Sequence, residues 1–450
     1  MKPLISILTP LATLALTACG LYTEAPRPVT EYDINEICQI DSLAPTIARL
    51  SWREMFPDPY LTAWIDSGLR ANTDLRKAQL QVEQAEATLR ASRLAFFPSV
   101  SVGADGTAGF NTTDKFTIGP SASWEVDIFG KQRNLKKGAE AAYYGSEAYA
   151  QAVRTQLIAT IANSYYTLLM LDEQLDISER TIKTWDENLR TLQALKRAGR
   201  TNEAAVLQAR ANRMQVEGSA VTLRNQINEQ ENVMRSLLLN PAADLARGLL
   251  SEQEFPDSLS AGVPLSLLLN RPDVREAAYE LQRCFYAINV SKAAFYPSLT
   301  LSGSAGWTTY EGTTVSNVSD WIASIAGSIA APIFSKGTNE ANLKIAQTNY
   351  EAASLDFQQT LLDAGIEVNN ALSDWQTARE RIALDKKQVV ALKGAVNTTR
   401  LLMRNSTTNY LEVLTAQQRL LEAELSKTSD TYAAIQAIIS LYHSLGGGTE

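Results

Sequence analysis

Residues 115–128 read KFTIGPSASWEVDI, and this stretch decides the fold. Its apolar side chains fall on alternate positions: Phe116, Ile118, Ala122, Trp124, Val126 and Ile128. Alternate side chains of a strand point to the same face, so the stretch predicts a strand with one apolar and one polar face. Residues 99–108 alternate in the same way, and residues 109–114 between the two segments predict a hairpin loop.

A second pair of alternating segments lies much later in the chain. Residues 298–307 alternate around Leu299, Leu301, Ala305 and Trp307. A fourth apolar row follows, made of Trp321, Ala323, Ile325, Ile329 and Ile333. Segments of about ten residues with one apolar and one small polar face are typical of transmembrane β-barrel strands. A soluble β-sandwich would show a similar alternation.

Aromatic residues gather at one end of these four segments. They are Phe96, Phe97, Phe129, Tyr296 and Phe334. Aromatic side chains at the ends of membrane strands suit the membrane–water interface. Ordinary core aromatics at strand ends are the alternative interpretation.

The rest of the chain predicts long helices. No proline occurs in residues 134–196 or 340–402, and a helix of about sixty residues is about 90 Å long. Heptad-like spacing of apolar residues supports this prediction. The two rows are Leu168, Leu171, Leu175, Ile182, Trp185, Leu189 and Leu192, then Leu411, Leu414, Leu421, Leu425, Tyr432, Ile435, Ile439 and Tyr442. A soluble coiled-coil bundle would share this pattern but would give the four strands no role.

The two halves of the chain repeat one another. FFPSV at 96–100 matches FYPSL at 295–299, and IFGK at 128–131 matches IFSK at 333–336. VLQA at 206–209 likewise matches VLTA at 413–416. Each half therefore predicts the order helix, strand, hairpin, strand, long helix, turn, long helix.

The N-terminus predicts export. Lys2 precedes an apolar stretch from Leu4 to Leu16, and LTAC at 16–19 ends it. A short apolar stretch with a small-residue cleavage site is a secretory signal, and Cys19 at the first mature position resembles a bacterial lipobox. Acyl chains on Cys19 would hold the mature chain at a membrane. An ordinary signal peptide with an incidental cysteine is the alternative.

These features divide the chain into segments. We expect a lipoprotein signal peptide at 1–18, a lipid-anchored extension at 19–50 and a first repeat at 51–240 with its β-hairpin at about 98–129. We also expect a connector at 241–263 and a second repeat at 264–445, with its hairpin at about 297–334. A tail at 446–450 ends the chain.

Composition and inventory exclude several function classes. A formal charge of −8 argues against a nucleic-acid binder. The single histidine, His443, excludes multi-histidine metal sites and leaves little for histidine-based catalysis. Glu125 and Asp127 lie on the polar row of one predicted strand, which favours an inner-face role over acid–base catalysis. The sequence predicts no enzyme, no bound metal and no cofactor other than the lipid on Cys19.

Two further cysteines remain. Cys284 lies on a predicted amphipathic helix, where a buried structural thiol is the default interpretation. Pairing of Cys284 with Cys38 in an oxidising compartment stays open, because one pair in a chain of this length is no disulfide framework.

Geometry predicts an oligomer. Four strands cannot close a barrel, and open sheet edges are not tolerated in lipid. Identical chains must therefore share one barrel. Two copies would give eight strands and a filled interior, whereas three would give twelve strands and room for a lumen.

The residues resemble the TolC family, in the branch of RND-type (NodT-like) outer-membrane lipoproteins. The likeness rests on Cys19, on WEVDIFG at 124–130, on LNRPDV at 269–274 and on AAFYPS at 293–298. It implies a homotrimer, with a twelve-stranded barrel in the outer membrane, a twelve-helix barrel in the periplasm and an equatorial region around 241–270 and the C-terminus. It also implies a periplasmic adaptor and an inner-membrane RND transporter as partners.

The resemblance further implies that two helical hairpin tips contact the adaptor. The residues concerned are Arg197, Gly199, Arg200, Thr201, Arg404, Asn405 and Thr408. The alternative is that Gly199 and Asn405 simply allow the chain to reverse.

Beyond the second tip, LEVLTA at 411–416 matches the region that lines a closed periplasmic aperture in related ducts. Glu412 falls at an acidic position, and three copies would form a ring of negative charge that favours cations. Thr415 stands where related ducts carry an aspartate, which argues against a double acidic ring. A solvated carboxylate on a helix face is the alternative for Glu412.

The sequence therefore predicts a passive outer-membrane exit duct of a tripartite RND-type efflux pump, located in the outer membrane of a Gram-negative-type bacterium. A type I secretion duct is the alternative within the transport class. A lipid-anchored periplasmic coiled-coil scaffold is the alternative from another class. The sequence does not choose the exported substrate.

Overall fold

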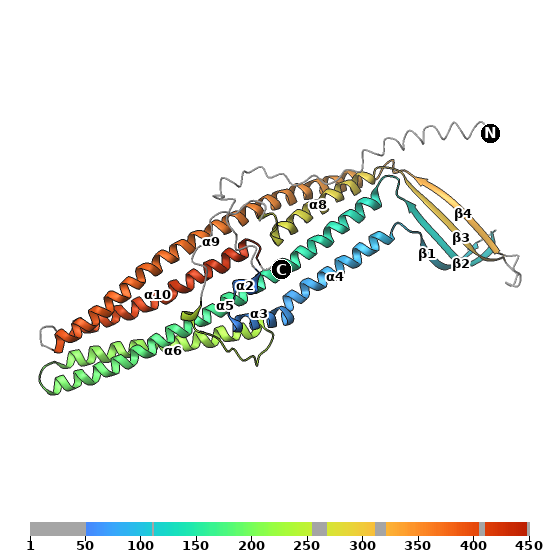
Figure 1. The fold of residues 1–450 in the computed structure, drawn as a ribbon. Helices are drawn as coiled ribbons and strands as arrows, with labels where there is room; N and C mark the ends of the chain where they lie inside the picture. The colour runs from blue at the N-terminus through green and yellow to red at the C-terminus, as the bar shows by residue number, and fades with distance from the viewer. Residues whose placement is uncertain (1–50, 110–111, 254–267, 311–320, 405–409, 448–450) are drawn as a thin grey trace. The chain divides into compact units, whose positions relative to one another are not determined.

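The computed structural model describes residues 51–109, 112–253, 268–310, 321–404 and 410–447. The predictions for Cys19, Cys38, Asn405, Thr408 and residues 254–263 lie outside this part. The chain divides into two compact units, which the two longest helices, α5 (Lys131–Arg197) and α9 (Thr338–Arg404), both enter (Figure 1). Each unit is described by itself.

The first unit contains one antiparallel sheet with its strands in chain order. The strands are β1 (Ser99–Gly109), β2 (Thr112–Val126), β3 (Ser298–Tyr310) and β4 (Trp321–Ala330). The unit also holds most of α4 (Thr73–Leu94), α8 (Pro272–Ala293) and the first parts of α5 and α9. The prediction of four strands in two hairpins is confirmed.

The strand ends differ from the prediction. The first hairpin is tighter, because Gly109 already pairs with Thr112. β2 ends at Val126 and β4 at Ala330, so Ile128 and Ile333 lie beyond the strands. Pro332 has no N–H group to donate to a ladder, which explains why the fourth apolar row stops before Ile333.

The register places the predicted apolar rows on one face. Antiparallel partners point to the same side, and the pairs Ala104↔Ile118, Trp124↔Leu301 and Leu299↔Ile329 join apolar residues across the strands. Hydroxyl groups join the strands on the other face. The oxygen–oxygen distances are 2.9 Å for Ser101–Ser121, 2.8 Å for Ser304–Ser324 and 3.2 Å for Thr117–Thr308. The sheet is therefore two-faced.

The middle of the sheet has a close approach of two backbones. The β2–β3 ladder is interrupted between Ile118↔Trp307 and Ser121↔Ser304, where Pro120 cannot donate. A Cβ on Gly119 would lie 2.1 Å from the carbonyl oxygen of Ala305. A residue without a side chain is therefore required at this crossing.

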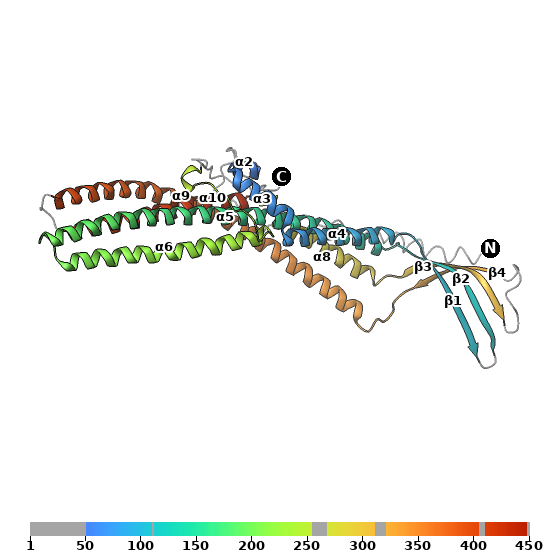
Figure 2. The same cartoon turned by 90° about the horizontal axis from the view of Figure 1, so that it is seen from below.

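The second unit is helical. It contains α2 (Trp52–Met55), α3 (Pro59–Ala71), α6 (Glu203–Leu237), the short η4 (Leu250–Glu252) and α10 (Tyr410–Ser444), with the remaining parts of α5 and α9. Figures 1 and 2 show α5 beside α6 and α9 beside α10 as helical hairpins. α5 and α9 have 67 residues each, which confirms the two long proline-free helices. Among the described residues, no helix is both long and apolar enough to cross a bilayer.

A buried polar network joins α3, α5 and the residues on both sides of η4. Asp58 caps α3 by accepting from the N–H of Tyr60 at 2.8 Å, and it accepts the Tyr165 hydroxyl at 2.6 Å. Gln253 donates its amide to the same carboxylate at 2.9 Å, and the N–H of Gly248 donates to the Tyr165 oxygen at 3.1 Å. The described part of the predicted connector is thereby fixed to α3 and α5.

Candidate functional site

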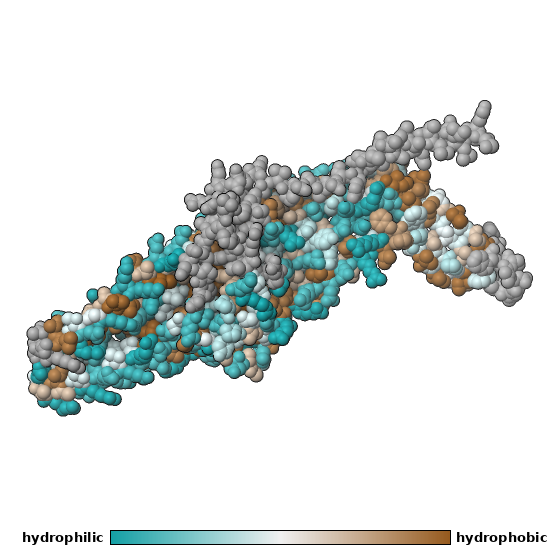
Figure 3. Space-filling view, in the orientation of Figure 1, coloured by the Kyte–Doolittle hydropathy of each residue, from teal (hydrophilic) through white to brown (hydrophobic). Residues whose placement is uncertain are grey.

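The apolar face of the sheet is exposed in the single chain. Val100, Val102, Ile325 and Ile329 have between 61% and 91% of their surface accessible, and Figure 3 shows hydrophobic residues on the strands and where the strands meet the helices. Apolar side chains exposed as a continuous row are unfavourable in water and favourable against lipid. The sheet is thus the part of the first unit that fits a membrane.

The WEVDIFG stretch ends β2 and starts α5. The indole N–H of Trp124 donates to the carbonyl of Phe96 at 2.9 Å, and Lys131 pairs with Glu125 at 3.0 Å. Asp127 accepts from the backbone N–H groups of Gln132 and of Arg133 at 2.9 and 3.0 Å. Asp127 therefore caps the helix dipole. It lies beyond the end of β2, so its predicted place on the strand is wrong.

All five predicted aromatics lie in the segments that connect helices to strands. Phe96 and Phe97 precede β1, Phe129 follows β2, Tyr296 precedes β3 and Phe334 follows β4. The rings of Phe129 and Tyr296 stack with centroids 5.0 Å apart, and Phe334 is exposed. The predicted position at one end of the strands is confirmed, whereas their role at a membrane interface stays a prediction.

The first hairpin tip is built by ordinary helix-end geometry. Gly199 adopts a φ of +70°, and the N–H of Arg200 donates back to the carbonyl of Leu195 at 2.9 Å. Asn202 caps α6 through the N–H of Ala205 at 3.0 Å. Arg197 and Arg200 are exposed, so the tip presents two guanidinium groups. The reversal predicted at Gly199 is confirmed, whereas adaptor contact is not tested by this geometry.

The predicted gate residues lie on one face of α10. Glu412 and Thr415 are both exposed, and they are three residues apart, so they lie about 60° apart around the helix. The Thr415 hydroxyl donates to the carbonyl of Leu411 at 2.9 Å. Leu411 itself is 60% exposed in the single chain, whereas Leu414 in the same row is buried.

The opposite face of α10 packs against the first hairpin. Tyr410 and Leu414 contact Trp185 and Leu192 of α5 and Val206 and Ala209 of α6 in one buried cluster. We call the contact of α10 with α5 and α6 the seam. Leu414, Trp185 and Leu192, which belong to the two heptad-like rows of the sequence, thus pack together between helices.

Two polar residues extend the seam. The amide of Asn188 donates to Gln417 Oε1 at 2.6 Å, and both side chains are buried. Burial raises the pKa of Tyr410 above its ordinary value. Sequence reasoning missed Tyr410 and Gln417 because it followed leucines. The spacing of Tyr410, Leu414 and Gln417 at i, i+4 and i+7 is the signal that could have found them.

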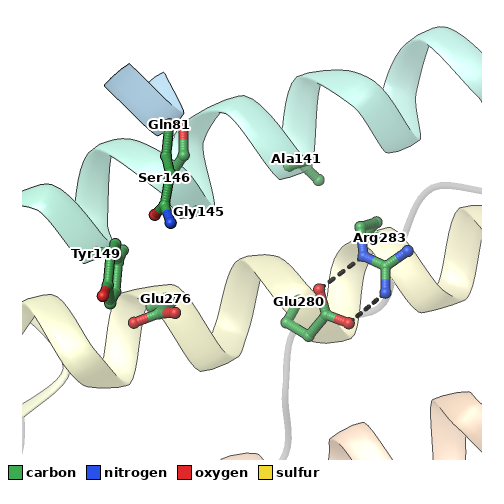
Figure 4. A pocket seen from close by; sticks show the side chains of 9 residues that line it. Gln81, Ala141, Gly145, Ser146, Tyr149, Glu276, Glu280 and Arg283 are labelled. Atoms are coloured by element: carbon green, nitrogen blue, oxygen red, sulfur yellow. Dashed lines mark hydrogen bonds and ion pairs between the residues drawn. The ribbon is translucent and has the colours of Figure 1, made fainter. Parts of the chain in front are cut away.

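A groove of about 380 Å³ lies in the first unit, between α5 and α8 (Figure 4). Glu280 and Arg283 form an ion pair in it, with Arg283 Nε 2.6 Å from Glu280 Oε2. Burial and the nearby carboxylates of Asp273 and Glu280 raise the pKa of Glu276, whereas the hydrogen bond from Arg283 lowers that of Glu280. The two carboxylates of this groove are thus shifted in opposite directions.

Cys284, on α8 next to this groove, is a free and buried thiol. Its Sγ lies 3.6 Å from Glu280 Oε1, and burial is the main cause of the raised pKa of the thiol. A raised pKa keeps the thiol protonated and unreactive, which agrees with a structural role. Among the described residues, no group of three acidic, cysteine or histidine side chains could hold a metal ion.

Comparison with known proteins gives consistent matches over nearly the whole chain. The chain is 28% identical over 447 residues to the cation efflux system protein CusC of Escherichia coli, covering 97% of each. It is 27% identical to the probable outer membrane lipoprotein SilC of Salmonella typhimurium, covering 95% of this chain and 94% of SilC.

Among solved structures, the open state of the MtrE outer membrane channel of Neisseria gonorrhoeae is similar in fold. The TM-score is 0.85 at 27% identity, covering 95% of this chain and 98% of that one. The model of the outer membrane efflux protein family matches residues 64–238 and 263–447. The chain therefore belongs to the outer membrane efflux protein family.

Proposed function

We propose that this chain forms, as a homotrimer, the passive exit duct of a tripartite RND-type efflux pump. Membership of its family makes the protein an outer-membrane efflux channel component and not an enzyme, as the sequence predicted. The trimer, the specific partners and the roles of single residues are the proposed parts.

The two-faced sheet is the observation that carries the proposal. It has four strands, an exposed apolar face and a hydroxyl-lined face. Among the described residues, its outer strands β1 and β4 each have a partner on one side only, and unpaired strand edges are not tolerated in lipid. Three copies joined edge to edge would close twelve strands with the apolar face toward lipid and the hydroxyl face toward a lumen.

In this proposal α10 provides the periplasmic constriction. Glu412 and Thr415 lie on its exposed face, opposite the seam. Three Glu412 carboxylates around the axis would favour cations over anions. Contact of the adaptor with the hairpin tips, including Arg197 and Arg200, would shift the trimer between closed and open populations. The energy for export would come from the inner-membrane transporter.

The proposal includes acylation of Cys19, which would anchor the chain to the outer membrane. Mass spectrometry of the mature N-terminus tests this point: a diacylglyceryl and acyl mass on Cys19 supports it, and an unmodified cysteine or cleavage elsewhere contradicts it.

The proposed cargo is small toxic substrates such as drugs or metal ions. CusC is a cation efflux system protein. A duct wide enough for several substrates would leave selectivity to the pump.

Planar-bilayer recording of the purified protein tests the duct. We expect discrete conductance from trimers and a preference for cations that falls when Glu412 is replaced by alanine. Thr415→Ala is the matched control, because it changes the same exposed face without removing charge. The absence of any conductance from a folded trimer would contradict the duct, whereas unchanged cation preference in Glu412→Ala would contradict the role of Glu412 alone.

A further inference from the structure

The seam contains two buried polar atoms that have no hydrogen-bond partner among the described residues. They are the hydroxyl oxygen of Tyr410 and Nε2 of Gln417, and each residue is only 6% exposed. Seven residues separate them, so they lie on the same face of α10, about 20° apart around the helix axis. Both therefore face the first hairpin when the seam is packed.

Polar groups of α10 farther from the tip are paired. The hydroxyl of Tyr432 lies 2.8 Å from the Thr167 hydroxyl of α5, and Gln174 of α5 donates to Ser429 at 3.0 Å. On α10, Tyr432 and Ser429 are thus paired with α5, whereas the Tyr410 hydroxyl and Gln417 Nε2 nearer the tip have no partner among the described residues.

The unpaired atoms oppose closure of the seam. A buried hydroxyl or amide without a partner destabilises the packed arrangement relative to one in which water reaches it. The apolar contacts of Leu414 with Trp185 and Leu192 act in the other direction, because separation would expose them. The stability of the packed seam at the tip end of α10 therefore depends on two opposing terms. Apolar packing favours the packed state, and the desolvation of the unpaired polar groups disfavours it.

We propose that the Tyr410 hydroxyl and the Gln417 amide set the closed–open equilibrium of the duct, by keeping the tip end of the seam weak enough to separate. The inference rests on the proposed function and deepens it. Glu412 and Thr415 occupy the other side of α10, so a movement of α10 away from α5 and α6 would carry both gate positions with it.

Tyr410→Phe is the decisive variant, because it keeps the ring in the cluster and removes only the unpaired hydroxyl. In planar bilayers we expect the open fraction of the full-length channel to fall about tenfold, equivalent to about 1.4 kcal/mol. The measurement is repeated in a Leu414→Ala background, where weaker packing raises the starting open fraction.

Tyr432→Phe is the matched control on the same helix. It makes the same chemical change but removes a hydroxyl that is paired with Thr167, so the open fraction should not fall. Thermal unfolding gives an independent readout: Tyr410→Phe should raise the unfolding temperature and Tyr432→Phe should lower it.

The two possible failures can be told apart. If the wild-type trimer conducts but Tyr410→Phe leaves the open fraction unchanged or higher, the inference is overturned and the duct stands. An equal fall in Tyr410→Phe and Tyr432→Phe also overturns it, because the effect would not depend on the unpaired hydroxyl. If no trimer conducts, the proposed function itself fails, and the unfolding temperatures still decide whether the hydroxyl weakens the seam.

Discussion

Lysine substitutions on the two faces of β4 test which face contacts lipid and which face lines the lumen. Ile325 lies in the middle of the strand on the apolar face, where it pairs with Gly303. Ala326 is the next residue, lies on the hydroxyl face and pairs with Ser302. Ile325→Lys and Ala326→Lys therefore introduce the same charge at nearly the same depth on opposite faces.

The expected difference follows from exposure and strand position. Ile325 is 91% exposed in the single chain, so its replacement removes little packing within the chain. A lysine facing lipid near the bilayer midplane costs about 2–4 kcal/mol per copy, or about 6–12 kcal/mol in a trimer. A lysine facing a water-filled lumen stays hydrated, so it avoids this cost and changes the ion selectivity instead. Ile325→Lys should therefore prevent stable insertion, whereas Ala326→Lys should insert and alter ion preference.

The assay is insertion into lipid vesicles followed by urea unfolding, together with the amount of each variant in outer-membrane fractions. Ile325→Ser should behave nearly as Ala326→Lys, because it removes the apolar group without adding charge. Equal loss of insertion for the two lysine variants would refute the assignment of faces. Normal insertion of Ile325→Lys would refute a lipid-exposed position for this residue.

Four further predictions concern single sites. Asp58→Ala should lower stability by about 2–4 kcal/mol, because it removes a helix cap and leaves a buried tyrosine hydroxyl without its acceptor; chemical unfolding measures this, and a loss below about 0.5 kcal/mol would contradict the network. Gly119→Ala should abolish the folded sheet, whereas Gly103→Ala should be tolerated, because nothing lies within 4 Å of a Cβ at Gly103. The amounts of the two variants in outer-membrane fractions measure this, and equal amounts would contradict the importance of the close approach. The folded pKa of Glu276 is raised, so the stability of the fold increases as the pH falls through that pKa. Glu276→Gln should therefore raise the unfolding temperature at pH 7 and make stability depend less on pH. The folded pKa of Glu280 is lowered, so its contribution to stability is present above the unfolded pKa and is lost as the pH falls through the folded pKa. Glu280→Gln should therefore lower the unfolding temperature at pH 7. Shifts of the unfolding temperature in the same direction for Glu276→Gln and Glu280→Gln would contradict the reasoning.

Local periodicity explains why much of the fold could be predicted. Alternation around Trp124 and around Leu301 predicted two strand faces that the register then joined as a direct pair. Long proline-free stretches predicted α5 and α9 to within a few residues. In both cases the side-chain period and the backbone requirements act within one element, so no knowledge of distant residues was needed.

Errors arose where a local pattern ran past the end of its element or around the helix. Ile128 and Ile333 continue the alternation beyond the strand ends, because a helix cap and a proline end the ladders there. Leu411 fits a leucine row but is exposed, whereas Tyr410 beside it is buried. An apolar residue type does not by itself fix which side of a helix meets a neighbour.

The sequence by itself determined that the chain has two-faced strands, long helices and a family-specific set of motifs, since each depends on residues close together in the chain. Only the tertiary structure decided which side of α10 is buried, which hydroxyls and amides are left unpaired, and how Asp58, Tyr165 and Gln253 come together. Hydrogen bonding and burial depend on partners that are tens or hundreds of residues away. A polar residue becomes costly or stabilising only when packing defines its neighbours.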